Sequence, residues 1–322
     1  MHKPTYCIVL AALVIVPMVT ATAQAQNFPT RPIRMIVPFA AGGSVDAVAK
    51  AVNAPASKRL GQPVYIEYVP GASGGTGAGL VAGTPADGYT VLLTSTALLI
   101  ANAMYKNSFD AHKDFTPVVE LARFDYALIA HPKFAARTVR ELVELGKKSK
   151  GTTSFASSGS ATASRVIGEV LNKNTGADLL HVPYRGAGPA RMDVVERQVD
   201  VAFDDLGPAL AAARAGKVRV LATTGKDRSP LAPDVPTIAE TFPGVFVDNW
   251  IGVFVRSGTP KAAVDRLNAA FAEAVKDPAV AKTMAAQSLV AVGSTPAAFE
   301  EVTQDFRKRY VDLIKQFVIE PD

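Results

Sequence analysis

The chain has 322 residues, of which 48% are hydrophobic and 20% are charged, and it contains 24 Gly and 22 Pro. This is the composition of a globular protein with a sizeable core, so it excludes a disordered, collagen-like or coiled-coil chain. The formal net charge is +5, aromatic residues make up 7%, and Lys and Arg alternate with Asp and Glu along the chain. These values argue against a nucleic-acid partner, and the length favours two domains.

The first 25 residues have the pattern of a secretory signal peptide. A basic start precedes an apolar run from Cys7 to Val19, and Ala23-Gln24-Ala25 is a small-residue cleavage pattern. We expect cleavage of residues 1–25 and export to the periplasm, with Ala21-Thr22-Ala23 as an alternative site. The single cysteine, Cys7, lies in the segment that is removed, so we expect neither disulfides nor thiol chemistry in the mature chain.

Short apolar runs that are typical of buried strands alternate with amphipathic stretches. The predicted strands are Ile33–Val37, Val64–Tyr68, Tyr89–Leu93, Tyr126–Ala130, Thr153–Ala156, Leu179–Val182, Val199–Phe203 and Val218–Ala222. The capping box Thr138–Glu141 predicts a helix start, and Thr259-Pro260 and Thr295-Pro296 predict two C-terminal helices, the second extending to about Phe317. About eight strands alternating with helices favour two α/β lobes with parallel crossovers.

A serine in a glycine-rich turn has the spacing of a catalytic nucleophile. Gly71-Ala72-Ser73-Gly74-Gly75 matches G-x-S-x-G and follows a predicted strand. A nucleophile elbow also needs a partnered histidine, and none is evident. The glycines suit a turn, so a hydrolase built on Ser73 is an alternative that we do not favour.

Signals for a cofactor or a metal are weak. The segment Gly77–Ala82 fits the loose dinucleotide fingerprint, but Tyr89–Asn107 contains no Asp or Glu for the ribose hydroxyl. The three histidines of the mature chain have no second ligand at metal spacing: His112, His131 and His181. We therefore expect no cofactor, no metal and no catalysis.

Two strand-to-helix turns have the same chemistry. The first is Ile36–Asp46, in which a strand ends, Gly42-Gly43 follows and a helix begins at Ser44. The second is Ser154–Thr162, again a strand, a small polar turn and a helix. A helix N-terminus presents unpaired N–H groups and the positive end of the helix dipole. Two such turns facing each other would hold a small carboxylate without lysine or arginine.

A set of short segments now points to a family. They are Ile33–Asp46, Pro70-Gly71-Ala72, Pro85–Thr90, His181–Gly186, Pro189-Ala190, Val199–Val201, Gly216–Arg219, Pro233–Glu240, Trp250-Ile251-Gly252 and Gly258-Thr259-Pro260. Together and in this order they resemble the Bug family of extracytoplasmic solute receptors, the binding proteins of tripartite tricarboxylate transporters. The resemblance covers essentially the whole mature chain.

The resemblance implies a periplasmic binding fold of type II with two lobes, each a mainly parallel sheet flanked by helices. Lobe 1 would comprise residues 26–125 and 248–322, lobe 2 would comprise residues 126–247, and the two would close on a ligand about a hinge. The expected function is to capture a small carboxylate and deliver it to the transporter's membrane subunits, as a monomer. A ligand sensor for a membrane signalling protein is an alternative, and the sequence does not identify the ligand.

The resemblance also implies that backbone N–H groups of the two turns, with bridging waters, hold the ligand carboxylate. The implied ligand-binding residues are Phe39, Gly42, Gly43, Ser44, Asp46, Thr94, Ser95, Thr96, Ser157, Ser158, Gly159, Ser160, Thr162, Tyr184, Arg185, Gly186 and Asp204. Asp204 is expected to orient water. The chain departs from the family at Ala161, at Tyr68–Gly71 and at Pro55, which we expect to end or kink the first helix.

Overall fold

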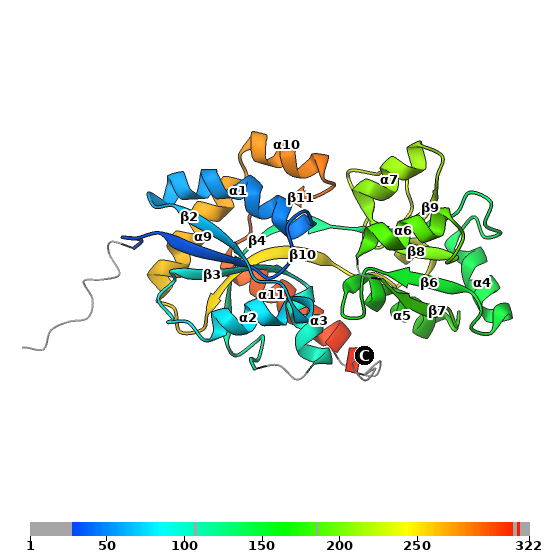
Figure 1. The fold of residues 1–322 in the computed structure, drawn as a ribbon, viewed down its shortest axis with the longest axis horizontal. Helices are drawn as coiled ribbons and strands as arrows, with labels where there is room; N and C mark the ends of the chain where they lie inside the picture. The colour runs from blue at the N-terminus through cyan, green and yellow to red at the C-terminus, as the bar shows by residue number, and fades with distance from the viewer. Residues whose placement is uncertain (1–27, 106–107, 185, 312–313, 316–322) are drawn as a thin grey trace, which may run out of the picture.

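The chain forms two β-sheets, each covered by helices, which lie side by side along the long axis of the molecule (Figure 1). This computed structural model describes residues 28–105, 108–184, 186–311 and 314–315. The first lobe contains a sheet of strand order β11-β4-β10-β3-β1-β2, and the second lobe contains a sheet of order β7-β6-β8-β5-β9. The predicted α/β architecture with two lobes is confirmed.

The elements of the first lobe come from both ends of the chain. They are β1 (Ile33–Val37), α1 (Ser44–Leu60), β2 (Val64–Tyr68), a 3₁₀ turn (Ala72–Gly74), α2 (Gly75–Ala82), β3 (Thr90–Ser95), α3 (Ala97–Met104), β4 (Phe115–Phe124), β10 (Asn249–Arg256), α9 (Lys261–Val275), α10 (Pro278–Ala286), β11 (Val290–Ala291), α11 (Pro296–Phe306) and a π-helical turn (Arg307–Val311).

The elements of the second lobe come from the middle of the chain. They are β5 (Tyr126–Ala130), α4 (Val139–Ser149), β6 (Ser154–Ser157), α5 (Ala163–Thr175), β7 (Leu180–Pro183), α6 (Ala187–Val195), β8 (Val201–Asp205), α7 (Leu206–Arg214), β9 (Arg219–Thr223) and α8 (Ile238–Thr241).

Strand directions place the carboxyl ends of β1, β3, β4, β6 and β8 toward the boundary between the lobes. Strand β4 leads into β5 through Asp125 alone, so β4 points toward the second lobe. Because β10 is antiparallel to both β4 and β3, and β1 is parallel to β3, the carboxyl ends of β1 and β3 also point there. In the second lobe β8 is antiparallel to β5 and parallel to β6, so β6 and β8 point back toward the first lobe.

The sheets are mixed, where we had expected mainly parallel ones. Strands β1, β2 and β3 are parallel to one another, as are β7, β6 and β8. The remaining pairings are antiparallel, and they involve β4, β10 and β11 in the first sheet and β5 and β9 in the second. The chain crosses between lobes along β4–β5 and returns into β10, and these crossings set the direction of the central strands.

Several local expectations are confirmed and others need correction. Thr295 caps α11 as predicted, with its side chain accepting the Ala298 N–H at 3.2 Å. Helix α1 continues through Pro55, which we had expected to end or kink it; the helix does not end there, and its apolar side is buried on both sides of the proline. Helix α9 starts one residue late, with Pro260 at the cap.

The capping box at α4 forms only in part. Thr138 accepts the Glu141 N–H at 3.2 Å, but the Glu141 carboxylate binds the Arg137 N–H at 2.6 Å instead of that of Thr138. The expected signal peptide and the expected helix end near Phe317 lie outside the described residues.

An aromatic cluster fills one face of the first sheet. Trp250 and Phe254 of β10 both pack on Phe299 of α11, with ring centroids 5.1 and 5.0 Å apart. Gly252 lies between them, and a Cβ there would stand 2.3 Å from the Phe299 ring. The close approach of α11 to β10 therefore depends on the missing side chain of Gly252.

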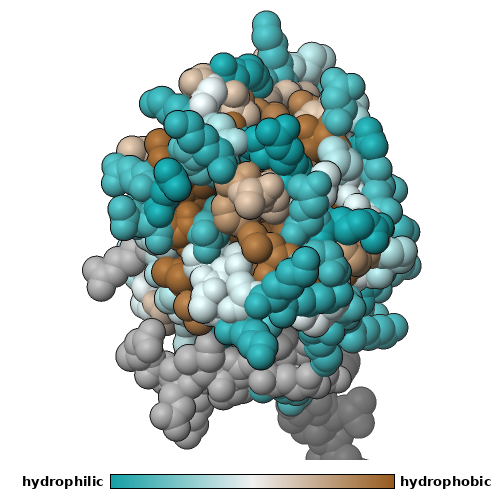
Figure 2. Space-filling view, turned by 90° about the vertical axis from the view of Figure 1, so that its right-hand side faces the viewer, coloured by the Kyte–Doolittle hydropathy of each residue, from teal (hydrophilic) through white to brown (hydrophobic). Residues whose placement is uncertain are grey.

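Helices α1 and α9 cover the opposite face of the first sheet. None of the helices in the described ranges has the length and apolar character needed to cross a lipid bilayer. At the free end of the second lobe, apolar side chains form separate patches between hydrophilic ones (Figure 2).

Replacing Gly252 with Ala should destabilise the first lobe. The added methyl group would overlap Phe299 and would stand 2.8 Å from the Val119 carbonyl oxygen, and overpacking of this kind lowers the free energy of unfolding by about 1–3 kcal/mol. The matched control is Gly188→Ala in α6, where no atom lies within 4 Å of the new Cβ. Urea unfolding followed by circular dichroism measures both variants, and equal midpoints would contradict this packing.

Candidate functional site

The first turn is built around a buried carboxylate. Asp46, 3% exposed, accepts the Gly42 N–H at 2.7 Å, the Lys50 ammonium at 2.9 Å and the Tyr68 hydroxyl at 2.6 Å. Burial alone would raise the pKa of Asp46, but the hydrogen bonds from Tyr68, Lys50 and Gly42 outweigh it and hold this pKa below its ordinary value. The structure thus gives Asp46 the role of fixing the turn, with its oxygens already occupied.

Helix α1 begins without a side-chain cap. Gly43 occupies the cap position with φ −92° and ψ 178°, and no side chain binds the first turn there. Within the described ranges, the N–H groups of Gly43 and Ser44 have no acceptor. Gly42, with φ 100°, is the residue of this turn that requires glycine, whereas Gly43 has an ordinary φ and nothing within 4 Å of a Cβ.

The second turn is closed by hydroxyl groups. The Ser158 N–H donates to Ser164 Oγ at 3.0 Å, and Thr162 Oγ1 donates to the Gly159 carbonyl at 2.7 Å. Thr162, the cap of α5, makes no side-chain bond to the helix N–H groups. In the described part of the chain, the N–H groups of Ser160 and Ala161 have no acceptor. The first turn therefore leaves backbone donors at the start of α1, and the second leaves them in the two residues before the cap of α5.

One histidine supports the second turn, which the sequence did not suggest. His181 of β7 places Nε2 2.7 Å from Ser157 Oγ, and its ring packs at 5.0 Å on that of Phe155. Burial, with Arg165 nearby, lowers the pKa of His181 to about 4, so the ring is neutral at pH 7. The sequence did contain a signal for this contact. The two successive apolar runs that form β6 and β7 pair in parallel, which places His181 beside Phe155 and within reach of Ser157.

The residues at the carboxyl end of β3 are more buried than a cleft lining would require. Thr94, Ser95 and Thr96 are 1%, 8% and 2% exposed. The Thr96 N–H donates to the Trp250 carbonyl at 3.3 Å, and Ser95 Oγ accepts the Ala97 N–H at 3.4 Å. Because β3 and β1 are parallel neighbours, these residues lie at the same sheet edge as the first turn. Phe39 of that turn lies beside Gly74.

Two residues expected to line the site in the second lobe, Tyr184 and Gly186, contact the second turn. The Tyr184 N–H donates to the Ser157 carbonyl at 3.0 Å, and the Gly186 N–H donates to that of Ser158 at 3.1 Å. The Tyr184 hydroxyl donates a hydrogen bond to the Asp193 carboxylate at 2.7 Å. Arg185 lies outside the described residues.

Asp204 at the end of β8 is fully buried and ion-paired. Arg191 Nη1 lies 2.8 Å from both carboxylate oxygens, and the Asp205 N–H donates to one of them at 3.0 Å. Burial raises the pKa of Asp204 to about 6, against the opposing effect of Arg191. Its oxygens, like those of Asp46, are held within the protein.

The two turns belong to different lobes and lie at the facing edges of the two sheets (Figure 1). Among the described residues, no hydrogen bond or ion pair joins residues 38–46 or 94–96 to residues 157–162 or 184–186. Each turn is therefore held by contacts within its own lobe.

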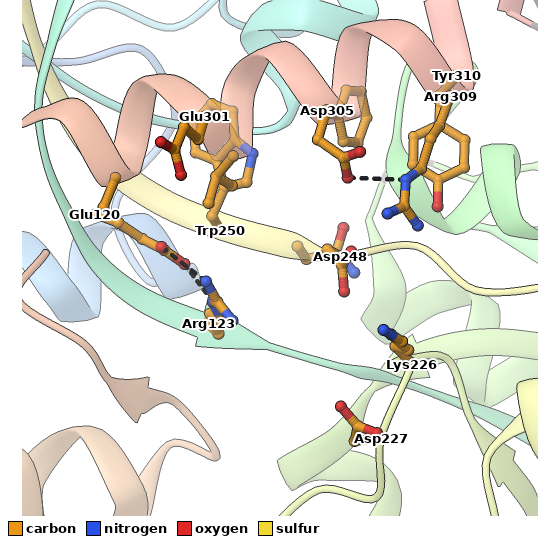
Figure 3. A pocket seen from close by; sticks show the side chains of 14 residues that line it. Glu120, Arg123, Lys226, Asp227, Asp248, Trp250, Glu301, Asp305, Arg309 and Tyr310 are labelled. Carbon is orange, nitrogen blue, oxygen red and sulfur yellow. Dashed lines mark hydrogen bonds and ion pairs between the residues drawn. The ribbon is translucent and has the colours of Figure 1, made fainter.

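A separate cavity of about 530 Å³ lies where the chain returns to the first lobe (Figure 3). Arg123 pairs with Glu120 at 2.6 Å and Arg309 pairs with Asp305 at 2.8 Å. Five acidic and three basic side chains line it: Glu120, Asp227, Asp248, Glu301 and Asp305, with Arg123, Lys226 and Arg309. The excess of carboxylates disfavours an anionic ligand, and none of the predicted site residues lines this cavity.

Ser73 lies in the short 3₁₀ turn with φ 53°. In the described ranges no histidine contacts it, and no group of three or more His, Cys, Asp or Glu side chains could hold a metal ion. The surroundings of Ser73 are those of a tight turn.

The paired sheets, the double crossing and the facing turns define a solute-binding protein with two lobes. Residues 48–319 match the family described as the tripartite tricarboxylate transporter family receptor. The chain belongs to this family, whose members are solute-binding receptors, so the protein is a receptor and not an enzyme. The predicted membership and periplasmic-binding fold are confirmed.

Known relatives resemble the chain over most of its length. A UPF0065 protein of Bordetella bronchiseptica is 38% identical over 93% of this chain and 90% of its own length. BugT of Bordetella pertussis is 31% identical over 92% of this chain and 93% of its own length. MatC of Rhodopseudomonas palustris, solved with bound malate, is 32% identical with a TM-score of 0.77 over 89% of this chain and 100% of its own. An R. palustris protein solved with adipate is 27% identical, with a TM-score of 0.78, over 90% of this chain and 97% of its own length.

Replacing Asp46 with Asn should loosen the first turn. Losing the charged acceptor should lower the free energy of unfolding by about 1.5–3 kcal/mol at pH 7. Since the folded-state pKa lies below the ordinary value, the carboxylate stabilises the fold above about pH 4, and this stabilisation is lost as the pH falls through the folded-state pKa.

In urea unfolding, the free energies of unfolding of the variant and the native protein should therefore differ at pH 7 and converge as the pH falls below the folded-state pKa of Asp46. Asp265→Asn is the matched control, because Asp265 forms an exposed ion pair with Lys261 in α9, and it should change the free energy of unfolding by less than about 0.5 kcal/mol. Equal effects of the two substitutions at pH 7 would contradict the role of Asp46.

Proposed function

We propose that this receptor captures a small carboxylate between its two turns and holds it mainly through backbone N–H groups. The observation that carries the proposal is the pair of turns whose helices begin without side-chain caps. Among the described residues, their N–H groups have no acceptor at Gly43 and Ser44, at the start of α1, and at Ser160 and Ala161, just before the cap of α5. Neither turn contains lysine or arginine. Helix N-termini supply the positive potential that a carboxylate needs.

The relatives favour a small dicarboxylate. One solved neighbour holds malate and another holds adipate, and both cover about nine-tenths of this chain. A dicarboxylate can place one carboxylate on each turn, so that ligand and lobes close together. In this proposal residues 26–125 with 248–322 and residues 126–247 move as two bodies about the crossings near Asp125 and Asp248.

Most of the remaining implied residues fall into three groups. Phe39, Tyr184 and Gly186 would form walls beside the donors, and Thr94, Ser95 and Thr96 would close the cleft floor. Asp46, Ser157, Ser158, Thr162 and Asp204 would hold the turns in place. This division follows from which polar atoms are already engaged inside the protein.

The receptor would act outside the cytoplasm as a monomer. Residues 1–25 have the pattern of an export signal, and the family is that of transporter receptors. After export and cleavage, the protein would deliver its ligand to the membrane subunits of a tripartite tricarboxylate transporter. A sensor role would use the same site, and affinity capture with those membrane subunits distinguishes the two roles.

A thermal-shift panel tests the ligand class. Malate and adipate should stabilise the mature protein, by about 2.7 kcal/mol once the ligand reaches a hundred times its Kd. Glucose and spermidine should leave the melting temperature unchanged, because neither carries a carboxylate. Stabilisation by the sugar or the polyamine alone would contradict the proposal.

Replacing Gly43 with Val tests the first turn. Its φ of −92° accepts any residue and no protein atom lies within 4 Å of a Cβ, so the new side chain would occupy ligand space without disturbing the fold. Losing two charge-assisted N–H bonds of about 1.5 kcal/mol each should weaken binding about 100-fold in titration calorimetry. Ser73→Ala is the control and should bind normally. A folded Gly43→Val variant with native affinity would show that the ligand binds elsewhere.

A further inference from the structure

We propose that His181 is a positioning residue of the second turn: its neutral imidazole donates from Nε2 to Ser157 and so fixes the backbone that presents the Ser160 and Ala161 N–H groups. The inference rests on the proposed function, because it assigns a role in the same site. His181 contributes no atom to the donors themselves; it would act through Ser157.

The contacts of Ser157 determine the direction of the hydrogen bond. Ser157 is fully buried, and its Oγ lies 3.0 Å from the Gly159 carbonyl oxygen. Two oxygens at this distance repel unless a hydrogen lies between them, so the hydroxyl donates to Gly159. His181 Nε2, 2.7 Å away, must then be the donor to Oγ. The network assigns the Nε2–H tautomer to His181.

The same hydroxyl also binds the other side of the turn. The Gly159 N–H donates to Ser157 Oγ at 3.3 Å, so Ser157 engages both the N–H and the carbonyl of one residue. Gly159 has φ 151°, a conformation that few other residues adopt. Fixing both polar groups of Gly159 sets the path of the next two residues, whose N–H groups remain free.

The position of His181 is itself well defined. The ring packs on Phe155, and β7 pairs with β6 so that Phe155 and His181 are direct neighbours. Its burial and the nearby Arg165 keep the ring neutral at pH 7, as a single-tautomer donor requires. Without this N–H, the Ser157 hydroxyl would lose one of its three contacts and could rotate away from Gly159.

Four variants separate positioning from packing. His181→Phe keeps a ring beside Phe155 but removes the donor, and it should weaken malate or adipate binding about tenfold. Ser157→Ala should weaken binding by about the same factor. The double variant should bind no more weakly than either single variant, because both substitutions break the same hydrogen-bonded pair. His181→Gln, which offers an amide N–H, should recover most of the affinity.

His131→Phe is the matched control. His131 follows β5 in the same lobe, at the end of the strand away from the crossing, and its Nδ1 accepts the Lys133 N–H at 3.1 Å. This variant should bind as the native protein does. Circular dichroism checks that each variant folds.

A ligand-free measurement decides the inference independently. Long-range ¹H–¹⁵N correlation spectra of the native protein should show His181 as the Nε2–H tautomer at pH 7. An Nδ1–H tautomer, or native affinity in folded His181→Phe, would overturn the inference. If native protein binds neither malate nor adipate, the proposed function fails, whereas the tautomer still tests His181. If His181→Phe does not fold, His181→Gln and the tautomer provide the test.

Discussion

The rest of the site depends on one constraint, the unpaired N–H groups at the start of α1 and in the two residues just before the cap of α5. A helix start must find acceptors for its first donors, from a side chain, from water or from a ligand. Here the cap positions are Gly43 and Thr162, and neither supplies a side-chain acceptor to its helix. The polar side chains nearby instead hold the turns: Asp46 binds Gly42, and Ser164 binds Ser158. The donors that remain require an acceptor from outside the protein.

The crossings between the lobes determine whether one ligand can reach both sets of donors. Thr224, which follows β9, connects the two crossings: the Tyr126 N–H donates to Thr224 Oγ1, the Thr224 N–H donates to the Tyr126 carbonyl, and the Val247 N–H donates to the Thr224 carbonyl, each at 3.0 Å. Asp125, between β4 and β5, is partly buried, and the loss of solvation raises its pKa to about 6. The two crossings are therefore joined through Thr224. In the proposed function they would form the hinge about which the two turns approach each other.

Much of this organisation could be predicted from the sequence, because it depends on local patterns. Strands β1, β2 and β5 have the predicted bounds, because each is a short run rich in apolar residues. Strands β1 and β5 are almost fully buried, whereas β2 at the sheet edge is partly exposed. Strands β4 and β10 were missed. Their patterns include Glu120 and Gly252, whose burial depends on Arg123 and on Phe299 from a distant helix. The antiparallel direction of several strands was also missed, because the crossings between the lobes set this direction and the alternation of strands and helices does not.

The candidate site could likewise be predicted only in part. Both turns and their helix starts follow from Gly and Ser after apolar runs, but the sequence cannot show which N–H groups remain free. That depends on where the side chains of Asp46 and Ser164 point once the chain has folded. Sequence spacing likewise gave no reason to pair His181 with Ser157, 24 residues apart. The parallel pairing of β6 and β7 creates that contact.

Amide spectra test the central claim, that free backbone donors bind the ligand, most directly. In ¹H–¹⁵N spectra of the labelled protein titrated with malate or adipate, we predict saturable downfield shifts at Gly43, Ser44, Ser160 and Ala161. The amides of Gly42 and Ser158 should shift less, because Asp46 and Ser164 already accept their hydrogens. Saturable shifts confined to the cavity around Lys226 and Asp248, with both turns unchanged, would contradict the claim.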